Sequence, residues 1–554
     1  MLKISTLFLF LYITVGGVVA QSINREELGV PFDFPLYLSG NFGELRSNHF
    51  HAGLDFKTQH QSGKRMLAIA DGYISRVQVT HGSGYVLHTV YDNGLSTTNL
   101  HLMGLVAPLA ALVDSIQYAN ESWQMDLTLE PNKYRIRKGE HIAWSGNMGY
   151  SFGPHLHFEL IDTATGDLLD AMPYYQHRLK DTRAPRAESY LFEPYFNKGI
   201  INGSTELTIE PVLAANTVSA WGVVGIGIKA FDFMDEVNNR YGVRKMEFYV
   251  DDQLSFESDI ARYHPSESRY INSWTYKNHM KTYIAPANPL KMIKAFNQDR
   301  GWLRIDEERL YNLRFVLTDF HGNSSTYRLS IRGIKQEIPL TPIDEAYQLS
   351  WDKTNYFSKL GLDLIIPSKA LYEDNYLDFE VLSADSTCNS FVYQLAKAER
   401  YIPLHKPSEL RIRVNPSLVA DTTKLYIAML NGKGEWNSVG GKYNAGFVHT
   451  KIRELGTFAV LTDFLPPKLK AVNKNNWIKS GEISFSSEDK QTGIQSYRGT
   501  IDGEYALFYL DIMPKRIKYK LDKSRLVRGK QHKVQLEVVD NAKNRTFIEE
   551  EFYW

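Results

Sequence analysis

The stretch GPHLHFEL at residues 153–160, together with HFHAGLDF at residues 49–56, decides how the rest of the chain is interpreted. In an extended strand, neighbouring side chains point to opposite faces. His155, His157 and Glu159 therefore share one face, while the apolar residues between them face a core. Two imidazoles side by side on an open face are poorly explained as core residues, so this stretch indicates a polar site built on a β-strand.

The second stretch adds a histidine and a carboxylate. His51 and Asp55 share a face in a strand as in a helix, and Gly53 argues against a helix. Two histidines and one carboxylate bind zinc at about 2.0–2.2 Å and leave a fourth position for water, as in catalytic zinc sites. The helical zinc motif H-E-x-x-H is absent from the sequence, so the base must come from elsewhere. Histidine suits that role because its unperturbed pKa is about 6.5.

The sequence around these stretches predicts an antiparallel β-domain. Residues 34 to about 175 are rich in glycine and alternate apolar and polar side chains, which is typical of strands joined by tight turns. The pattern changes between residues 105 and 135, where leucine and alanine recur at near-helical spacing from Ala107 to Tyr118. We interpret this segment as an inserted helix that either covers the site as a lid or buttresses the outside of the domain.

The remainder of the chain is rich in strands, so the fold class is mainly β. Residues 190–335 and 466–554 share a weak repeat in which a strand ends at an aspartate and a turn with glycine or asparagine follows, as at Asp319 and Asp540. The repeat predicts two immunoglobulin-like β-sandwiches. Residues 340–464 form a further β-rich domain between them. We expect these three domains to fold independently of the first.

Composition and the N-terminus bear on location and partners. A lysine, a short apolar run and small residues up to Ala20 predict a secretory signal peptide over residues 1–20. The chain has 554 residues with 63 basic and 63 acidic side chains, so no net charge favours nucleic acid or an anionic membrane as a partner. The single cysteine, Cys388, excludes an internal disulfide. We expect an exported protein of the bacterial periplasm or cell envelope, or a released one, without a transmembrane segment after signal removal.

The two histidine stretches, the His101-Leu102 pair between them and the turn GNMG at residues 146–149 resemble the lysostaphin-like (LytM-type) zinc metallopeptidases. Members of that family hydrolyse peptide bonds in peptidoglycan. The resemblance covers residues 36–175, within a peptidase domain predicted at residues 34–180. It implies an antiparallel β-sheet peptidase domain, one zinc ion per chain, and a secreted endopeptidase that acts on peptidoglycan peptides.

The resemblance also implies roles for five residues. The metal ligands are His51, Asp55 and His157, and the histidines that activate the water and stabilise the oxyanion are His101 and His155. All five positions hold the residue type of the family. Two alternatives stay open: a catalytically inactive LytM-like domain that regulates another wall hydrolase, and a protein whose C-terminal β-domains mainly bind wall glycan or protein. Inactive relatives generally lose zinc ligands, and this sequence retains them.

Departures from the family pattern affect the surroundings of the site. The family's tyrosine two residues before the middle histidine is Asn99 here, which is expected to alter substrate contacts. Met148 replaces a small polar residue and makes the groove wall more apolar. The connection from Leu102 to Arg137 is longer than typical. Arg46 matches a family position near the cleft, where it binds a substrate carboxylate or forms a surface ion pair.

Overall fold

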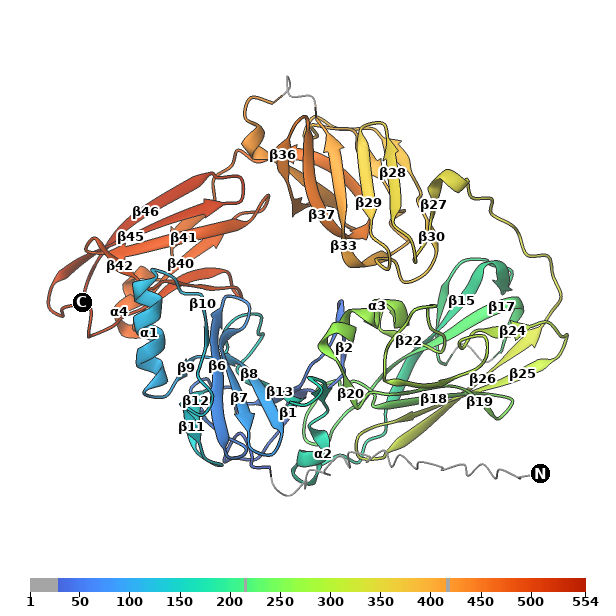
Figure 1. Ribbon diagram of the computed structural model, residues 1–554, viewed down its shortest axis with the longest axis horizontal. Helices are drawn as coiled ribbons and strands as arrows, with labels where there is room; N and C mark the ends of the chain where they lie inside the picture. The colour runs from blue at the N-terminus through green and yellow to red at the C-terminus, as the bar shows by residue number, and fades with distance from the viewer. Residues whose placement is uncertain (1–27, 214–216, 415–418) are drawn as a thin grey trace, which may run out of the picture.

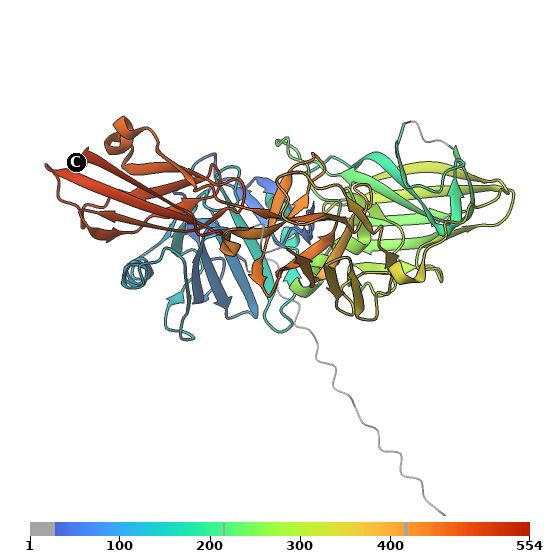
Figure 2. The ribbon, with the colours of Figure 1, turned by 90° about the horizontal axis from the view of Figure 1, so that it is seen from above.

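The structure is a computed structural model that describes residues 28–213, 217–414 and 419–554; the predicted signal peptide lies outside them. Strands dominate, and the prediction of a mainly β fold is confirmed. Four β-rich parts follow one another around a ring, and the last returns to the helix of the first (Figure 1). Seen from above, the four parts form a flat layer (Figure 2). Within the described residues, no helix is long and apolar enough to cross a membrane.

The N-terminal domain, predicted at residues 34–180, is built on one antiparallel sheet in the order β1-β4-β13-β8-β7-β6-β10. β5, β12 and β9 form a separate small sheet. Because β4 pairs with β13, Asp55 stands opposite His157, and the two histidine stretches become neighbours. The elements are β1 (Leu38–Gly40), β2 (Leu45–Arg46), β3 (His49–Phe50), β4 (Leu54–Lys57), β5 (Arg65–Leu67), β6 (Gly72–Thr80), β7 (Gly84–Tyr91), β8 (Leu95–Leu102), β9 (Gly104–Leu105), α1 (Leu109–Ala119), β10 (Met125–Thr128), β11 (Arg135–Ile136), β12 (His141–Trp144), β13 (His155–Asp162), β14 (Leu168–Leu169), α2 (Met172–Tyr175) and η2 (Gln176–Arg178).

The inserted segment has a role that sequence alone did not indicate. Its strand β10 extends the main sheet by pairing with β6, and Leu109 and Val113 of α1 are buried in the core. The other face of α1 contacts the C-terminal domain. An Arg525 Nη2 donates to Asp114 at 2.6 Å, and the guanidinium lies 3.3 Å from the ring centre of Tyr118. The segment therefore docks the C-terminal domain onto the N-terminal domain.

The second domain, predicted at residues 190–335, continues the core of the first. A single cluster of buried apolar side chains runs through both, from Phe32 to Ile331. The sequence predicted that the N-terminal domain folds by itself. Separation from the second domain would expose the core that the two domains share. The strand order is β16-β15-β17-β26-β25-β18-β19-β23, and β20 pairs with β14 of the first domain. The main strands are β15 (Arg186–Ile201), β16 (Thr208–Pro211), β17 (Thr217–Phe231), β18 (Lys245–Val250), β19 (Gln253–Asp259), β20 (Arg262–Tyr263), β23 (Ile293–Phe296), β25 (Leu310–Thr318) and β26 (Ser324–Gly333).

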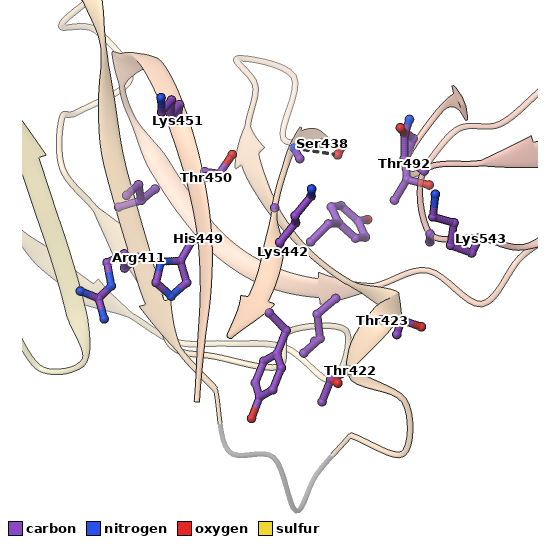
Figure 3. Close-up of a pocket in the computed structure, with 18 of the residues that line it drawn as sticks. Arg411, Thr422, Thr423, Ser438, Lys442, His449, Thr450, Lys451, Thr492 and Lys543 are labelled. Carbon is purple, nitrogen blue, oxygen red and sulfur yellow. Dashed lines mark hydrogen bonds between the residues drawn. The ribbon is translucent and has the colours of Figure 1, made fainter. Parts of the chain in front are cut away.

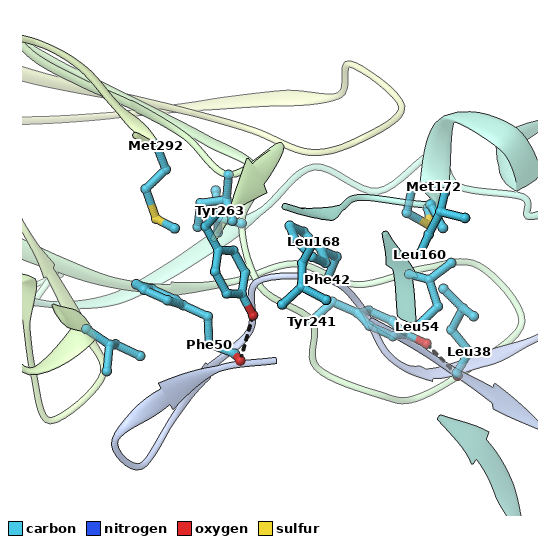
Figure 4. Close-up of a cluster of buried hydrophobic side chains, with 14 of the residues drawn as sticks. Leu38, Phe42, Phe50, Leu54, Leu160, Leu168, Met172, Tyr241, Tyr263 and Met292 are labelled. Carbon is cyan, nitrogen blue, oxygen red and sulfur yellow. Dashed lines mark hydrogen bonds between the residues drawn. The ribbon is translucent and has the colours of Figure 1, made fainter. Parts of the chain in front are cut away.

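Two buried tyrosines of the second domain hold the backbone next to the histidine stretch (Figure 4). The hydroxyl of Tyr263 donates to the carbonyl of Phe50 at 3.0 Å, and that of Tyr241 donates to the carbonyl of Leu38 at 2.8 Å. Phe50 immediately precedes His51, and Leu38 lies on β1, which pairs with β4. The second domain thus supports the strands that present the site.

The third domain, predicted at residues 340–464, has two five-stranded antiparallel sheets, β28-β29-β33-β37-β36 and β31-β32-β38-β34-β35. The C-terminal domain, predicted at residues 466–554, has two four-stranded antiparallel sheets, β39-β40-β44-β43 and β42-β41-β45-β46. The immunoglobulin-like character of the second and C-terminal domains stays a prediction. The strands are β28 (Asn355–Lys359), β29 (Leu362–Ile366), β31 (Glu380–Leu382), β32 (Val392–Gln394), β33 (Ile402–Arg413), β34 (Leu425–Leu430), β35 (Trp436–Gly440), β36 (Lys442–Asn444), β37 (Phe447–Leu455), β38 (Thr457–Thr462), β39 (Lys468–Ala471), β40 (Glu482–Glu488), β41 (Ile494–Ile501), β42 (Glu504–Ala506), β43 (Tyr509–Asp511), β44 (Arg516–Lys520), β45 (Gln531–Asp540) and β46 (Arg545–Tyr553).

The shared core predicts a large effect of Tyr263→Ala. Removing this buried ring is expected to lower the free energy of unfolding of the first two domains by about 3–5 kcal/mol. Tyr263→Phe keeps the ring and should cost about 1–3 kcal/mol, because the Phe50 carbonyl loses its donor. Denaturant titration of the full chain measures both. The control is Tyr356→Ala, at a residue 77% exposed, which should change stability by about 0.5 kcal/mol or less. Equal midpoints for Tyr263→Ala and Tyr356→Ala would contradict the shared core.

Candidate metal centre

Three potential ligand atoms converge at one point of the N-terminal domain. The distances among His51 Nε2, Asp55 Oδ1 and His157 Nδ1 are 2.8–3.0 Å. All three side chains are buried. His51 directly follows β3, in the short connection to β4; Asp55 lies on β4 and His157 lies on the paired strand β13. Two adjacent antiparallel strands and the connection that leads into the first of them therefore supply the cluster.

Hydrogen bonds on the far side of each ring decide which nitrogen faces the cluster. His51 Nδ1 donates to the carbonyl of Asn41 at 2.6 Å, and His157 Nε2 lies 3.3 Å from Glu159 Oε1. A carbonyl and a carboxylate only accept hydrogen bonds, so the ring protons belong there. The lone pairs of His51 Nε2 and His157 Nδ1 then point at Asp55 Oδ1. Three acceptors at these distances repel one another unless a cation lies among them, and two imidazoles with one carboxylate suit zinc.

The pKa values of His157 and Asp55 show that the cluster favours a positive charge next to the Asp55 carboxylate. Burial opposes the charged form of His157, but hydrogen bonds to Asp55 and Glu159 outweigh it and raise its pKa to about 9. Burial likewise opposes ionisation of Asp55, yet His51 and His157 hold the pKa of this carboxyl well below its usual range. Burial lowers the pKa of His51 to about 4. Protons and metal compete for such a cluster, because a metal requires both imidazoles as neutral ligands.

Arg46 is hydrogen-bonded to the cluster of proposed ligands. Its Nη2 donates to Asp55 Oδ2 at 3.0 Å and to Glu44 Oε2 at 3.2 Å. A Cβ at Gly40 would lie 2.6 Å from Asp55 Oδ2, so glycine leaves room for this carboxylate. Burial raises the pKa of Glu44 to about 7. Arg46 thus forms an ion pair with Glu44 and Asp55, as one of its two interpretations expected, and this pair orients the Asp55 carboxylate.

Two more imidazoles lie beside the cluster. The ring centroids of His101 and His155 are 4.8 Å apart. His101 Nδ1 donates to the carbonyl of Met148 at 2.7 Å, and His155 Nδ1 donates to the carbonyl of Gly153 at 2.8 Å. Each ring therefore keeps Nε2 available, and that of His155 lies 3.7 Å from Asp55 Oδ1. Burial, reinforced by the adjacent His155, lowers the pKa of His101 to about 4, so this ring is neutral near pH 7.

The side chain of His101 points to the site because the regular alternation of side chains along β8 is interrupted at this residue. Its φ of 62° is left-handed, which is uncommon for a residue other than glycine. Asn99 on the same strand stands opposite Phe158 and is fully buried. Its amide donates to Thr97 Oγ1 and to the carbonyl of Leu87. Direct contact of Asn99 with a substrate, as expected from the sequence, does not fit this position on the core face.

Two supporting groups were missed by sequence reasoning. Asn41 orients His51 through its backbone carbonyl, and a backbone contact leaves no signal in residue type. Ser151 Oγ lies 3.1 Å from His155 Nδ1 and donates to Asn147 Oδ1 at 2.6 Å. The polar pair Asn147 and Ser151, four residues apart just before His155, is the signal that was available.

A groove of about 740 Å³ lies between the N-terminal and C-terminal domains, and it is linked to the site through Met148 rather than lined by the two accessory histidines themselves. Met148, whose carbonyl holds His101, lines it together with His81 from the N-terminal domain. Tyr509 and Lys518 line it from the C-terminal domain. The docked C-terminal domain therefore forms one wall of the groove beside the site.

A wider groove lies elsewhere, between the third and C-terminal domains (Figure 3). Basic side chains are prominent in it, including Arg411, Lys442, Lys451 and Lys543. Its described lining residues all come from the third and C-terminal domains, so it is separate from the histidine cluster.

Comparisons with known proteins give a family model for the third domain and solved structures that are similar to about a quarter of the chain. Residues 346–463 match the model of the Zu5-like domain family. A zinc-containing peptidase from Vibrio cholerae is 23% identical, with 27% of this chain and 39% of that chain covered and a TM-score of 0.20. The catalytic domain of a mutant of EnpA, a prophage-encoded M23 protein from Enterococcus faecalis, is 19% identical, with 25% and 92% covered and a TM-score of 0.19. The catalytic domain of lysostaphin from Staphylococcus simulans is 23% identical, with 28% and 97% covered and a TM-score of 0.18.

These neighbours are M23 and lysostaphin-type peptidases, which confirms the resemblance predicted from the motifs. The chain spans 39% of the length of the Vibrio cholerae peptidase. At these identities and TM-scores, the likeness supports no conclusion about activity. The function of this chain therefore has to be inferred from its side chains.

Proposed function

We propose that this chain is an exported zinc endopeptidase that hydrolyses peptide bonds of bacterial peptidoglycan in the cell envelope. One observation carries the proposal: three lone pairs, from His51, Asp55 and His157, meet at one point beside two free imidazole nitrogens. That combination supplies a metal site together with groups that move protons. The groove that begins at Met148, whose carbonyl holds His101, offers room for an extended peptide.

In this proposal, His51, Asp55 and His157 hold one zinc ion. Zinc at such a donor set lowers the pKa of water to about 7 and polarises a carbonyl. Arg46 keeps Asp55 oriented by a hydrogen bond to its second oxygen. Asn41 and Glu159 keep both imidazoles in the ligating tautomer.

His155 and His101 carry out the proton transfers. Nε2 of His155 accepts a proton from the attacking water as the C–O bond forms, because its Nδ1 is occupied by Gly153. His101, held by the Met148 carbonyl, uses its free Nε2 to orient that water. The imidazolium at His155 then lies beside the developing oxyanion and returns its proton to the leaving nitrogen as the C–N bond breaks. The products are a carboxylate and an amine.

The competing proposal is an inactive LytM-like regulator. An inactive domain has no need to keep five side chains and their orienting partners in register. Here each of the four histidines bonds through its far ring nitrogen to a fixed acceptor, namely Asn41, Met148, Gly153 or Glu159. This arrangement favours an enzyme.

Zinc retention tests the ligand assignment. His157→Ala is expected to lose the single zinc ion, because it removes one of three ligands. His141→Ala should keep it, since this partly exposed histidine lies on β12, outside the ligand cluster, and bonds to the carbonyl of Ala143. Elemental analysis after zinc loading and dialysis provides the measurement. A His157→Ala protein that retains zinc as the wild type does would refute the assignment.

Turnover separates the accessory histidines from the ligands. His155→Ala should keep zinc but lower kcat/KM by about 10²–10⁴-fold, because proton transfer is lost. The assay counts new amino groups released from purified peptidoglycan and identifies the fragments by mass spectrometry. His141→Ala serves again as the matched control. If His155→Ala digested the wall as fast as this control, the role of His155 would be wrong.

If the C-terminal domain forms one wall of the substrate groove, reversing the charge at its docking contact should weaken substrate binding. Arg525→Glu places a second carboxylate against Asp114 and should loosen the docked domain. We expect a higher KM for long wall fragments with zinc content unchanged. The double variant Asp114→Arg with Arg525→Glu restores an opposite-charge pair and should recover much of the effect. Unchanged kinetics in Arg525→Glu would show that this wall takes no part in substrate binding.

A further inference from the structure

Three buried aspartates meet near the junction between the N-terminal and second domains. Asp181, Asp232 and Asp319 each bring a carboxylate oxygen within 4.8 Å of the others. Asp181 lies in the linker after η2, Asp232 directly follows β17 and Asp319 directly follows β25. Asp232 is fully buried, and the other two are less than a tenth exposed. This cluster belongs to no part of the histidine site.

Asp232 is the residue that demands an explanation. Neither of its carboxylate oxygens has a hydrogen-bond partner of standard geometry. Oδ2 of Asp181 also lacks one. An isolated buried carboxylate is costly unless it is paired, protonated or bound to a metal. Several free oxygen atoms therefore face one another where water is excluded.

The positive charge available nearby is limited. His321 forms an ion pair with Asp181, with Nδ1 3.5 Å from Oδ2, and its Nε2 donates to the carbonyl of Leu179 at 2.8 Å. The Asp181 carboxylate raises the pKa of His321 to about 9, so this ring is charged near pH 7. Burial, together with the neighbouring Asp319 and Asp181, raises the pKa of Asp232 to about 8. One imidazolium balances at most one of three carboxylates.

The repeat in the C-terminal domain shows which part of the cluster is architectural. In the second domain, Asn323 donates through Nδ2 to Asp319 Oδ2 at 2.7 Å and to the Asp181 carbonyl at 3.3 Å. In the C-terminal domain, Asn544 makes the equivalent bonds, to Asp540 Oδ2 at 2.8 Å and to the Asp463 carbonyl. The Asp-Asn turn thus belongs to the fold of both domains and by itself indicates no ligand.

The third carboxylate distinguishes the two clusters. In the C-terminal domain, Asp489 Oδ1 accepts the backbone N–H of Gly493 at 2.6 Å, and Asp463 Oδ2 accepts the hydroxyl of Thr492 at 2.6 Å. Asp489 is also partly exposed. Among the described residues, the corresponding Asp232 has no hydrogen bond of standard geometry and no exposure to solvent; the backbone N–H of Phe233 acts on it but does not offset the effect of burial on the pKa. The second domain therefore has, in addition to the Asp-Asn turn, a buried carboxylate whose oxygens are left without hydrogen bonds of standard geometry.

We propose that Asp181, Asp232 and Asp319 bind a calcium ion that fastens the linker to the ends of β17 and β25. The donor atoms are carboxylate oxygens, which select hard cations over zinc or copper. Calcium accepts irregular arrangements of mono- and bidentate carboxylates, whereas magnesium requires near-ideal octahedral geometry and keeps several waters. A buried cluster without hydrogen bonds of standard geometry at Asp232 fits calcium better. The ion holds the second domain in the position from which Tyr241 and Tyr263 support the zinc strands.

Calcium content of the full, zinc-loaded chain tests this inference. Protein stripped of calcium is dialysed against calcium chloride at about 1 mM, within the range of extracellular calcium modules. Calcium and zinc are then measured in the same sample. The wild type is expected to retain one calcium more than Asp232→Asn, and calcium should raise the thermal midpoint of the wild type but not that of the variant. Asp252→Asn, whose carboxylate is 92% exposed in the same domain, is the matched control and should behave as the wild type.

Folding failure is recognised separately. Without calcium, Asp232→Asn should be about as stable as the wild type near pH 7, because a carboxyl with a pKa of about 8 is already largely protonated and the amide is a neutral group of similar size. Its zinc content should be unchanged. Equal calcium retention by the wild type and Asp232→Asn would overturn the proposal, as would a wild-type midpoint that ignores calcium. Dialysis against magnesium chloride alone forms a further arm. An equal shift with magnesium would overturn the assignment to calcium.

Discussion

The structure depends on one electrostatic constraint: three hydrogen-bond acceptors face one another at 2.8–3.0 Å inside the N-terminal domain. Such an arrangement is unfavourable unless positive charge lies among the three atoms. The surroundings increase that demand. Arg46 orients Asp55 by a hydrogen bond, while the Asn41 carbonyl and Glu159 turn both imidazole lone pairs inward. The positive charge comes either from a proton, which the raised pKa of His157 of about 9 reflects, or from a metal ion that replaces it.

Other domains bear on the same site from two sides. The second domain shares a core with the first, and its buried tyrosines bond the backbone beside the ligand strands. The C-terminal domain docks on α1 through Arg525 and lines the groove next to Met148. Domains distant in sequence therefore surround the candidate metal centre and line the groove beside it.

Strand alternation and a family resemblance were sufficient to predict that His51, Asp55 and His157 come together, because these residues lie on or next to regular antiparallel strands. Their role as metal ligands stays a proposal. Alternation alone would have misplaced His101, whose left-handed backbone reverses its direction. The same strand turns Asn99 into the core, where the expected substrate contact is not available. The helix expected from Ala107 to Tyr118 is present as Leu109–Ala119. Its docking partner was not predictable, because that contact joins residues about four hundred positions apart, a separation that periodicity does not report.

Anomalous X-ray scattering at the zinc edge, from crystals of the zinc-loaded protein, tests the central claim most directly. The account predicts one strong peak per chain, about 2.0–2.2 Å from His51 Nε2, Asp55 Oδ1 and His157 Nδ1, with the rings in the orientations set by Asn41 and Glu159. A zinc peak elsewhere, or none at this point after loading, would contradict it.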